Sequence, residues 1–441
     1  MTYENFKSII LTVLVCISIL LTWSIWTYQP SYEFLEKPDT VQEVSIGPKK
    51  DVKKIVKPDR MFFHYTKDKH LGTVDTGEID RLLNDISKWN FTSIEDVSDQ
   101  VKNFSTFVHN PGNAVIHFSD SVPMELYRTI IDVKDKDFPN FFFDRIVIDV
   151  ENIQKEQGYV YFVSEKERRA YKSHVASSFV NNFKNGLYKN AEFSPNFADY
   201  FSYRAANETL LFLPAGETDI SSYQYLLNPL DSEKFKFALF KDPGVVQRNY
   251  QPWGEEYTNG SSLLRIYQDK NILSYVNPVG GNDTGDFSKS LLKRSIDFVN
   301  EHGGWTDNYR YVEMDEAKHK VLFRLYDSKG YPIFSENNIS EISQTWGQNE
   351  INEYIRSNFY LGLQMEATST ILRSGQQVME YLESLKGFDR EKLQDVVIGY
   401  TMTKDPQTRV IYLEPSWYYQ YDHSWKQVTE DEPGGRNRGL E

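Results

Sequence analysis

An uncharged apolar segment near the start of the chain constrains the fold most. Residues 8–28 read SIILTVLVCISILLTWSIWTY, without a charged side chain. At about 1.5 Å per residue, a helix of this length spans a hydrocarbon core of roughly 30 Å. The segment is too long for the apolar part of a signal peptide, and no small-residue cleavage site follows it. We therefore predict an uncleaved transmembrane helix over residues 8–28, preceded by a short stub at residues 1–7.

The residues that flank this segment indicate its orientation. Lys7 and the α-amino group stand against Glu4 on the N-terminal side, which is a weak positive-inside signal. Trp23, Trp26 and Tyr28 lie at the other end, where an aromatic belt is expected at a membrane interface. We predict a single-pass protein of the cell membrane, with a cytoplasmic N-terminus and an extracellular C-terminal region.

One face of the predicted helix carries small and hydroxylated side chains. At about 100° per residue, these side chains fall within an arc of about 160°. Such a face lets another helix approach closely and form hydrogen bonds in lipid, although it also arises often by chance. It predicts contact with a partner helix. The face consists of Ser8, Thr12, Cys16, Ser18 and Thr22.

Composition excludes several classes of protein. The chain has 441 residues and a formal net charge of −14, with 40% hydrophobic residues. This length supports roughly two to four domains, and the acidic balance argues against nucleic acid as a partner. Cys16 is the only cysteine, so the region beyond the anchor has no disulfide, thiol nucleophile or cysteine metal site. A large extracellular region without disulfides is typical of a Gram-positive bacterium.

A basic segment follows the predicted linker. Residues 49–60 read KKDVKKIVKPDR. Two interpretations stay open, contact with anionic lipid or teichoic-acid phosphates and a solvated linker edge. The lysines that would make the first kind of contact are Lys49, Lys50, Lys53, Lys54 and Lys57.

Helical and alternating apolar patterns indicate an α+β fold with helices packed on mainly antiparallel sheets. Helix followed by antiparallel hairpin recurs in the second and third regions, which predicts that the last two domains are similar to each other. We predict a linker at 29–60, an N-terminal α+β domain at 61–172, a central α+β domain at 173–286, a C-terminal α+β domain at 287–425 and a disordered tail at 426–441.

Individual patterns predict several local elements. Apolar spacing at Ile79, Leu82, Leu83 and Ile86 predicts a helix, with Thr76 as its N-cap. FKFALF, residues 235–240, alternates and predicts a strand. Turns are expected at 268–271 and at Asp405-Pro406, and VGGNDTGD at 279–286 predicts a flexible boundary.

The sequence carries no local signature of catalysis. It lacks a P-loop, a dinucleotide-binding glycine motif, H-E-x-x-H and G-x-S-x-G. None of the eight histidines is spaced as a metal-ligand pair. Asp315 and His319 fit a solvated hairpin turn, and adjacent Glu255 and Glu256 point to opposite faces of extended chain. We predict no catalytic residue, cofactor or metal.

Two aromatic stretches admit two interpretations. QPWGEEY at 251–257 and EPSWYYQY at 414–421 are dense enough for a stacking platform that binds glycan or peptide. In the second stretch, Trp417 and Tyr419 would share one strand face and Tyr418 the other. Core packing is the favoured interpretation, because aromatic strands usually face a helix.

Several segments resemble a known family. They are ILLTWSIWTYQPSYEFLE at the anchor and, in the C-terminal region, GYPIF, NEINEYIRSNFYLG, SGQQVMEYL, IGYTM and YLEPSWYY. In these segments the chain resembles the YycH (WalH) family, membrane-anchored regulators of the WalK (YycG) sensor histidine kinase in low-GC Gram-positive bacteria. The C-terminal segments also look like the sister family YycI. The resemblance covers essentially the whole chain.

The resemblance implies a non-enzymatic accessory protein with three extracellular domains, of which the last two are related. It implies action together with a YycI-like membrane protein on the WalK (YycG) kinase that controls cell-wall metabolism, through transmembrane helix contacts. No catalytic residue is carried over. Whether the effect is inhibitory or activating stays open, and so does a homodimer.

Two other functions stay open. The extracellular region is alternatively a binding module for cell-wall glycan, teichoic acid or peptide, which relays occupancy through its anchor. A cell-wall hydrolase is a third candidate, and it would depend on a single acidic residue.

Overall fold

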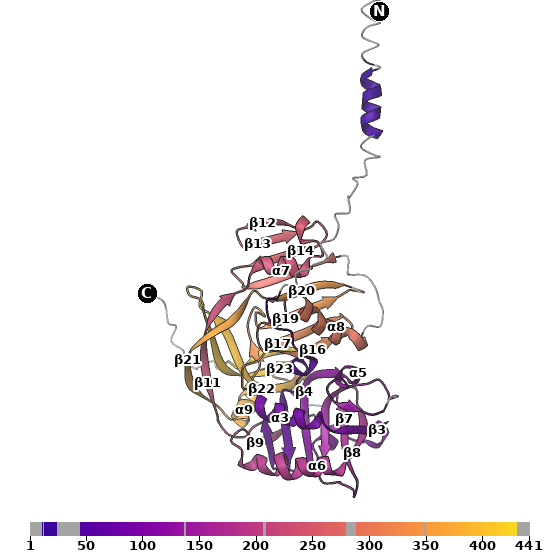
Figure 1. The fold of residues 1–441 in the computed structure, drawn as a ribbon. Coiled ribbons are helices and arrows are strands. Elements are labelled where there is room, and N and C mark those ends of the chain that lie inside the picture. Colours follow the sequence, from indigo (N-terminus) through magenta and orange to yellow (C-terminus); the bar gives the residue numbers. More distant parts are fainter. Residues whose placement is uncertain are drawn as a thin grey trace, which may run out of the picture. The chain divides into compact units, whose positions relative to one another are not determined.

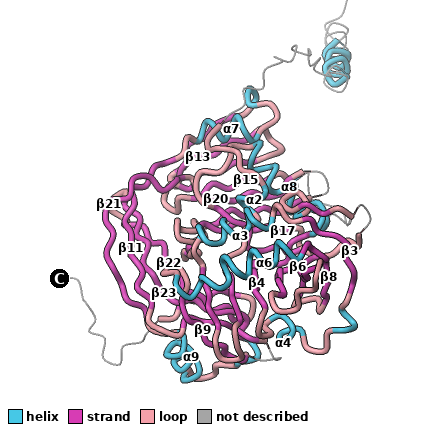
Figure 2. Tube along the Cα trace, turned by 60° about the horizontal axis from the view of Figure 1, so that its bottom comes forward, coloured by secondary structure: helices cyan, strands magenta, loops and turns pink. Residues whose placement is uncertain are grey.

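Strands dominate the structure, which is a computed structural model. It divides into two compact units, Met1–Glu43 and Val44–Glu441. In the second unit the strands form three sheets with short helices against them (Figures 1 and 2), so the predicted α+β class is confirmed. The structure describes residues 11, 13–23, 45–135, 138–205, 209–278, 288–347 and 350–429.

Ten strands form the N-terminal sheet, drawn in indigo to magenta in Figure 1. All its strand pairs are antiparallel except β3 with β5. In spatial order the strands are β10 (Leu210–Pro214), β9 (Ala198–Arg204), β2 (His70–Thr73), β1 (Arg60–His64), β4 (Asn113–Pro123), β6 (Phe142–Asp149), β7 (Gln157–Ser164), β8 (Arg169–Ala176), β3 (Asn90–Asp96) and β5 (Asp132–Val133).

The second sheet, called the long-strand sheet, contains the longest strands. Its order is β18 (Ile333–Phe334), β22 (Leu393–Lys404), β23 (Val410–Tyr421), β11 (Thr218–Pro229) and β21 (Phe359–Leu372), with β24 (Ser424–Gln427) also paired to β23. The third, called the meander sheet, is antiparallel. Its order is β12 (Gln247–Gln251), β13 (Gly254–Thr258), β14 (Leu263–Tyr267), β15 (Ile272–Val276), β20 (Ile351–Ser357), β19 (Glu341–Trp346), β17 (Lys320–Leu325) and β16 (Tyr309–Asp315).

The main helices are amphipathic and lie against these sheets. Helix α3 (Thr76–Ile86) forms where the apolar spacing predicts and buries Ile79, Leu82 and Ile86. Its N-cap is Asp75, not Thr76, because the Asp75 carboxylate accepts the Glu78 backbone N–H at 3.0 Å. The other α-helices are α2 (Val52–Ile55), α4 (Phe104–Val108), α5 (Met124–Tyr127), α6 (Ser177–Phe183), α7 (Ser232–Leu239), α8 (Ser288–Glu301) and α9 (Gly375–Ser384).

The strand predicted at 235–240 is wrong, because these residues lie mostly in helix α7. The Asp231 carboxylate caps the helix by accepting the Glu233 N–H at 3.0 Å. Phe235 and Leu239, four residues apart, are its buried side chains. Apolar residues at i and i+4 fit both a two-residue and a 3.6-residue repeat, so the cap decides between them.

The hairpins fall where the turn residues predict them. Residues 268–271 join β14 to β15, and Asp405-Pro406 lies between β22 and β23. Asp315 ends β16 and His319 precedes β17, which confirms that turn as well. The similarity of the central domain to the C-terminal domain stays a prediction. The segment 279–286 lies outside the described residues.

The sheets cross the predicted domain boundaries. β9 and β10, assigned to the central domain, complete the N-terminal sheet, and β11 pairs with β21 and β23 of the C-terminal region. The predicted tail is partly wrong as well. Its first two residues, Lys426 and Gln427, belong to β24, and Val428 N–H donates to Trp417 O at 2.8 Å. Apolar patterns place strands well, but strand pairing over long sequence separations decides which sheet they join.

Three histidines form a row on the N-terminal sheet, called the histidine row. The pairing of β1 with β2 places His64 opposite His70. The Nδ1 atoms of these two rings are 2.9 Å apart, and His64 Nε2 lies 2.9 Å from His109 Nδ1. The Phe212 ring packs against all three imidazoles.

Burial keeps the histidine row uncharged. Burial and the neighbouring His70 lower the pKa of His64 to about 3. Burial also lowers the pKa of His70, and burial together with His64 lowers the pKa of His109 well below its ordinary value. A neutral ring donates one hydrogen and accepts one, so a neutral row satisfies both contacts of His64.

We expect the stability of the full chain in detergent to fall as the pH drops from 7 to 5. An unfolded histidine titrates near pH 6.5 and folded His64 near 3, so the unfolded state binds more protons across this window. For His64 alone the loss at pH 5 is about 2 kcal/mol. Urea unfolding at both pH values measures it. His64→Gln should weaken the pH dependence, whereas the exposed His423→Gln should not; an unchanged dependence in His64→Gln contradicts this account.

Candidate functional site

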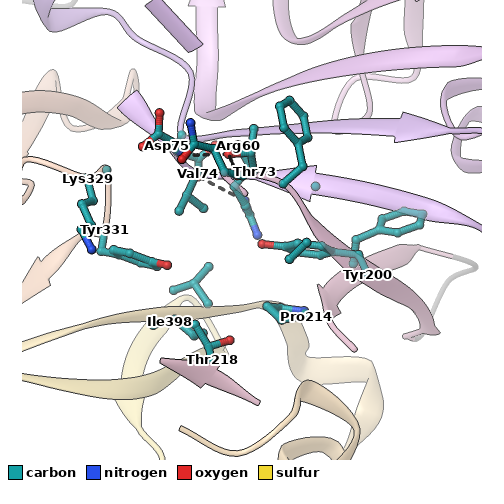
Figure 3. Close-up of a pocket in the computed structure, with 18 of the residues that line it drawn as sticks. Arg60, Thr73, Val74, Asp75, Tyr200, Pro214, Thr218, Lys329, Tyr331 and Ile398 are labelled. Atoms are coloured by element: carbon teal, nitrogen blue, oxygen red, sulfur yellow. Dashed lines mark hydrogen bonds and ion pairs between the residues drawn. The ribbon is translucent and has the colours of Figure 1, made fainter. Parts of the chain in front are cut away.

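A pocket of about 300 Å³ lies where the N-terminal sheet, the long-strand sheet and the loop 327–332 meet (Figure 3). Its walls come from segments far apart in the chain. Aromatic rings, hydroxyl groups and a few charged side chains line it. The residues labelled in Figure 3 are Arg60, Thr73, Val74, Asp75, Tyr200, Pro214, Thr218, Lys329, Tyr331 and Ile398.

A buried ion pair joins two of the sheets at this pocket. Arg60 of β1 donates from Nη1 and Nη2 to the two carboxylate oxygens of Asp395 on β22, at 2.9 and 2.6 Å. The side chains are 9% and 19% exposed. Asp59 Oδ2 lies 3.4 Å from Arg60 Nε, and Asp59 Oδ1 lies 2.7 Å from His117 Nδ1. The bidentate geometry fixes direction as well as distance between the sheets.

In this cluster, neighbouring charges oppose the effect of burial on the pKa values of Asp59 and Arg60. Burial alone would raise the pKa of Asp59, but Arg60 and His117 hold it well below its usual range. Burial would lower the pKa of Arg60, yet Asp395 and Asp59 raise it. Burial, Arg145 and Arg60 lower the pKa of His117 to about 4, against the opposing effect of Asp59. At neutral pH the cluster therefore contains ionised Asp59 and Arg60 with a neutral imidazole.

The loop 327–332 forms the third wall. The Asp327 carboxylate accepts the backbone N–H groups of Gly330 and Tyr331, both at 2.7 Å. Gly330 has φ +113°, and a Cβ there would lie 2.1 Å from Val74 O, so the position requires glycine. The Thr76 N–H donates to Lys329 O at 2.9 Å. This loop is thereby attached to the first turn of α3.

The geometry favours binding or support over catalysis at this site. The Asp59–His117 pair has the arrangement of an acid–base dyad, but Arg60 Nη2 lies 3.2 Å from His117 Nε2, where a nucleophile would be needed. Thr73, the nearby hydroxyl, donates to Asn196 O at 2.6 Å. Among the described residues no group of three His, Cys, Asp or Glu side chains is placed to hold a metal ion.

The predicted partner-helix face is only partly described. Cys16, Ser18 and Thr22 lie on the described helix, whereas Ser8 and Thr12 lie outside the described residues. Thr22 Oγ1 donates to Ser18 O at 2.8 Å, which uses its hydrogen within its own helix. Among the described residues, no helix combines the length and apolar character that a membrane crossing requires.

The predicted interface anchor is likewise described in part. Trp23 ends the described helix and is 69% exposed. Trp26 and Tyr28 lie outside the described residues, so the anchor stays a prediction.

The basic segment does not form one exposed lysine cluster. Lys57 is buried and its Nζ lies 2.5 Å from Asp80 Oδ1, while Lys50 Nζ donates to Asp307 O at 2.7 Å. For these two residues the prediction of an anionic-surface contact is wrong, because their ammonium groups are engaged inside the fold. Lys49, Lys53 and Lys54 are exposed, and their contact stays a prediction.

The aromatic stretch 414–421 contributes mainly to packing, as favoured from the sequence. Trp417 and Tyr418 are 4% and 5% exposed, and Tyr418 stacks on Phe334 with ring centroids 4.0 Å apart. In the stretch 251–257, Tyr257 is buried, and Glu255 and Glu256 pair with different arginines, Arg248 and Arg265 respectively.

The central polar side chains pair with one another, an arrangement that suits binding or structural support. Both parts of the sequence match models of one family. The YycH protein N-terminal domain matches residues 4–192, and the YycH protein C-terminal domain matches residues 208–434. The chain belongs to the YycH family.

Two further comparisons, one of sequence and one of structure, agree with this assignment. The two-component system WalR/WalK regulatory protein YycH of Bacillus subtilis (strain 168) is 26% identical over 463 residues, which cover 100% of both chains. The crystal structure of YycH from Bacillus subtilis has a TM-score of 0.73 to this chain at 21% identity, covering 88% of this chain and 99% of that one. At this level of identity the structural likeness shows the fold.

We expect Asp395→Ala to destabilise the full chain by about 2–3 kcal/mol, since it leaves the buried Arg60 guanidinium with one facing carboxylate, Asp59, in place of two. Urea unfolding in detergent at pH 7 measures this loss. The triple variant Asp59→Asn, Arg60→Met and Asp395→Leu removes the guanidinium together with the two carboxylates that face it, and it should recover most of the loss. Glu192→Ala breaks an exposed pair with Lys69 and serves as control, with an effect below about 1 kcal/mol. Equal effects of Asp395→Ala and Glu192→Ala would refute the role of the buried pair.

Proposed function

We propose that this chain is a non-enzymatic, membrane-anchored regulator of the WalK (YycG) sensor histidine kinase of the WalR/WalK system, which controls cell-wall metabolism. The observation that carries the proposal is the match, over the full length of both chains, to a protein named as a WalR/WalK regulatory protein. The neutralised central cluster supports it, because its imidazole faces a guanidinium instead of a nucleophile.

The proposed mechanism is packing of the helix over residues 8–28 against the kinase and a YycI-like partner. The N-terminus is cytoplasmic and the folded region extracellular. A regulator shifts a two-state kinase only through different affinities for the two states, and about 1.4 kcal/mol changes the ratio tenfold. A few interhelical hydrogen bonds of about 0.6 kcal/mol each supply this amount.

The hydrogen bond of Thr22 indicates how the helix over residues 8–28 would contact its partner. Because the Thr22 hydroxyl donates to Ser18 O within its own helix, it can act toward a partner through its lone pairs and its small size. Cys16 and Ser18 add small side chains to the same face. Close packing therefore contributes more here than hydrogen bonds donated by Thr22.

We expect Thr22→Leu to change WalK-dependent transcription several-fold in the native cell, because its larger side chain separates the helices. Thr22→Val keeps the shape and removes the hydroxyl, so it should change the output little if packing dominates. Leu20→Val, on the opposite apolar face, is the control. Transcription reporters and membrane levels of each variant are the measurements. Normal output from Thr22→Leu at a normal protein level argues against this face.

The pocket between the N-terminal sheet, the long-strand sheet and the loop 327–332 favours a second candidate function, ligand binding. Its volume of about 300 Å³ and its mixture of aromatic and hydroxyl groups suit part of a small polar ligand, such as a cell-wall glycan fragment or a peptide. In this alternative, occupancy would change how the three walls fit together and would be relayed to the anchor.

We expect soluble peptidoglycan fragments to raise the melting temperature of the full chain in detergent if this alternative holds. Thr218→Phe would fill the pocket and abolish the shift, because the half-buried Thr218 lines it. Differential scanning fluorimetry is the measurement. A shift that survives Thr218→Phe would exclude this pocket as the site.

A further inference from the structure

Residues 45–50, predicted as linker, are part of the fold and lie along the loop 303–307 that follows α8. We call residues 45–50 the strap. The backbone N–H groups of Ile46 and Gly47 donate to Gly303 O at 3.0 and 2.6 Å, and Trp305 N–H donates to Pro48 O at 3.0 Å. These are main-chain contacts, so they hold the path of the strap rather than its side chains.

One side chain continues this pattern. Asn300, near the end of α8, accepts the Lys50 N–H on Oδ1 at 2.9 Å and donates from Nδ2 to Lys50 O at 3.0 Å. The same Oδ1 accepts the indole N–H of the buried Trp305 at 2.8 Å. An amide that pairs with both backbone groups of one residue acts like a neighbouring strand.

Two glycines let the strap and the loop approach closely. Gly304 has φ +80°, and a Cβ there would lie 2.2 Å from Gly47 O. A Cβ on Gly47 would lie 2.5 Å from Trp305 O. A side chain at either position would push two backbones apart, so the contact depends on glycine on both sides.

The other side of the loop supports the meander and long-strand sheets. Arg356 of β20, fully buried, donates to Gly304 O at 3.2 Å and to Thr306 Oγ1 at 2.9 Å. Asp307 Oδ1 accepts the Leu361 N–H at 3.2 Å, near the start of β21. The loop is therefore held by the strap on one side and by β20 and β21 on the other.

We infer that the strap is a relay, which couples the position of the chain leaving the membrane anchor to the loop 303–307 and from there to β20 and the start of β21. Residues 24–44 alone separate the described helix from the strap. A displacement of the strap removes its hydrogen bonds to the loop 303–307. The loop then moves more freely, which weakens the hydrogen bonds that it accepts from Arg356 and from the Leu361 N–H. This inference rests on the proposed function for the membrane anchor at one end of the relay and for the kinase signal at the other.

Hydrogen exchange on the full chain in detergent tests the coupling. Gly47→Ala should release the strap and raise amide exchange about tenfold in residues 45–50, 303–307 and 359–362, with strands β6 and β7 unchanged. Gly216→Ala is the matched control, since nothing lies within 4 Å of a Cβ there. Asn300→Ala, which adds no bulk, is the second variant and should give the same pattern. Faster exchange confined to residues 45–50 in both variants overturns the relay.

A reporter of WalK-dependent transcription separates this inference from the proposed function. If deletion of the whole chain leaves transcription unchanged, the proposed function fails while the exchange result still decides the coupling. If deletion alters transcription, Gly47→Ala should reproduce part of that change at a normal membrane level, and Gly216→Ala should not. Wild-type output from Gly47→Ala in that case overturns the relay as a signalling element.

Discussion

The buried pair of Arg60 and Asp395 is the interaction on which the arrangement of the sheets depends. Removing two charges from water costs several kcal/mol per ion unless each meets its partner with good geometry. Arg60 lies at the start of β1 and Asp395 near the start of β22, so the two sheets satisfy these charges only in one relative position. Asp59 and His117 complete the cluster, and the pocket is the space left beside it.

Local elements of the fold could be predicted because their causes are local. The apolar repeat of α3 and the turn residues of the hairpins are read from a few neighbouring positions. The apolar spacing of helix α7 fits a strand as well as a helix, so only the Asp231 cap distinguishes the two. The sheets that β9, β10 and β11 join could not be predicted, because sheet membership depends on pairing between distant segments.

The site itself could not be predicted from the sequence. Arg60 and Asp395 are 335 positions apart, and nothing in the basic segment that ends at Arg60 points to Asp395. The histidine row depends on tertiary contacts as well, although the spacing of His64 and His70 around a tight turn is a signal that a hairpin would place them opposite each other. Lys50 and Lys57 resemble solvated charges in the sequence, and only tertiary partners such as Asp80 show otherwise.

These features fit a regulator more closely than a catalyst. The Arg60–Asp395 pair joins the N-terminal and long-strand sheets, and the strap is held by hydrogen bonds against the loop 303–307. In this account the helix makes the contact that changes the kinase, and the folded region sets how that contact is presented. This separation of roles between the helix and the folded region requires no catalysis at the pocket beside Arg60.

The most direct test replaces the helix. The full chain with residues 8–28 exchanged for an unrelated transmembrane helix is expressed in the native cell beside residues 1–30 alone, and WalK-dependent transcription is measured at matched membrane levels. The account predicts that the exchanged chain loses regulation and that residues 1–30 retain part of it. Full regulation by the exchanged chain, with none from residues 1–30, would contradict the account and assign the kinase contact to the extracellular region.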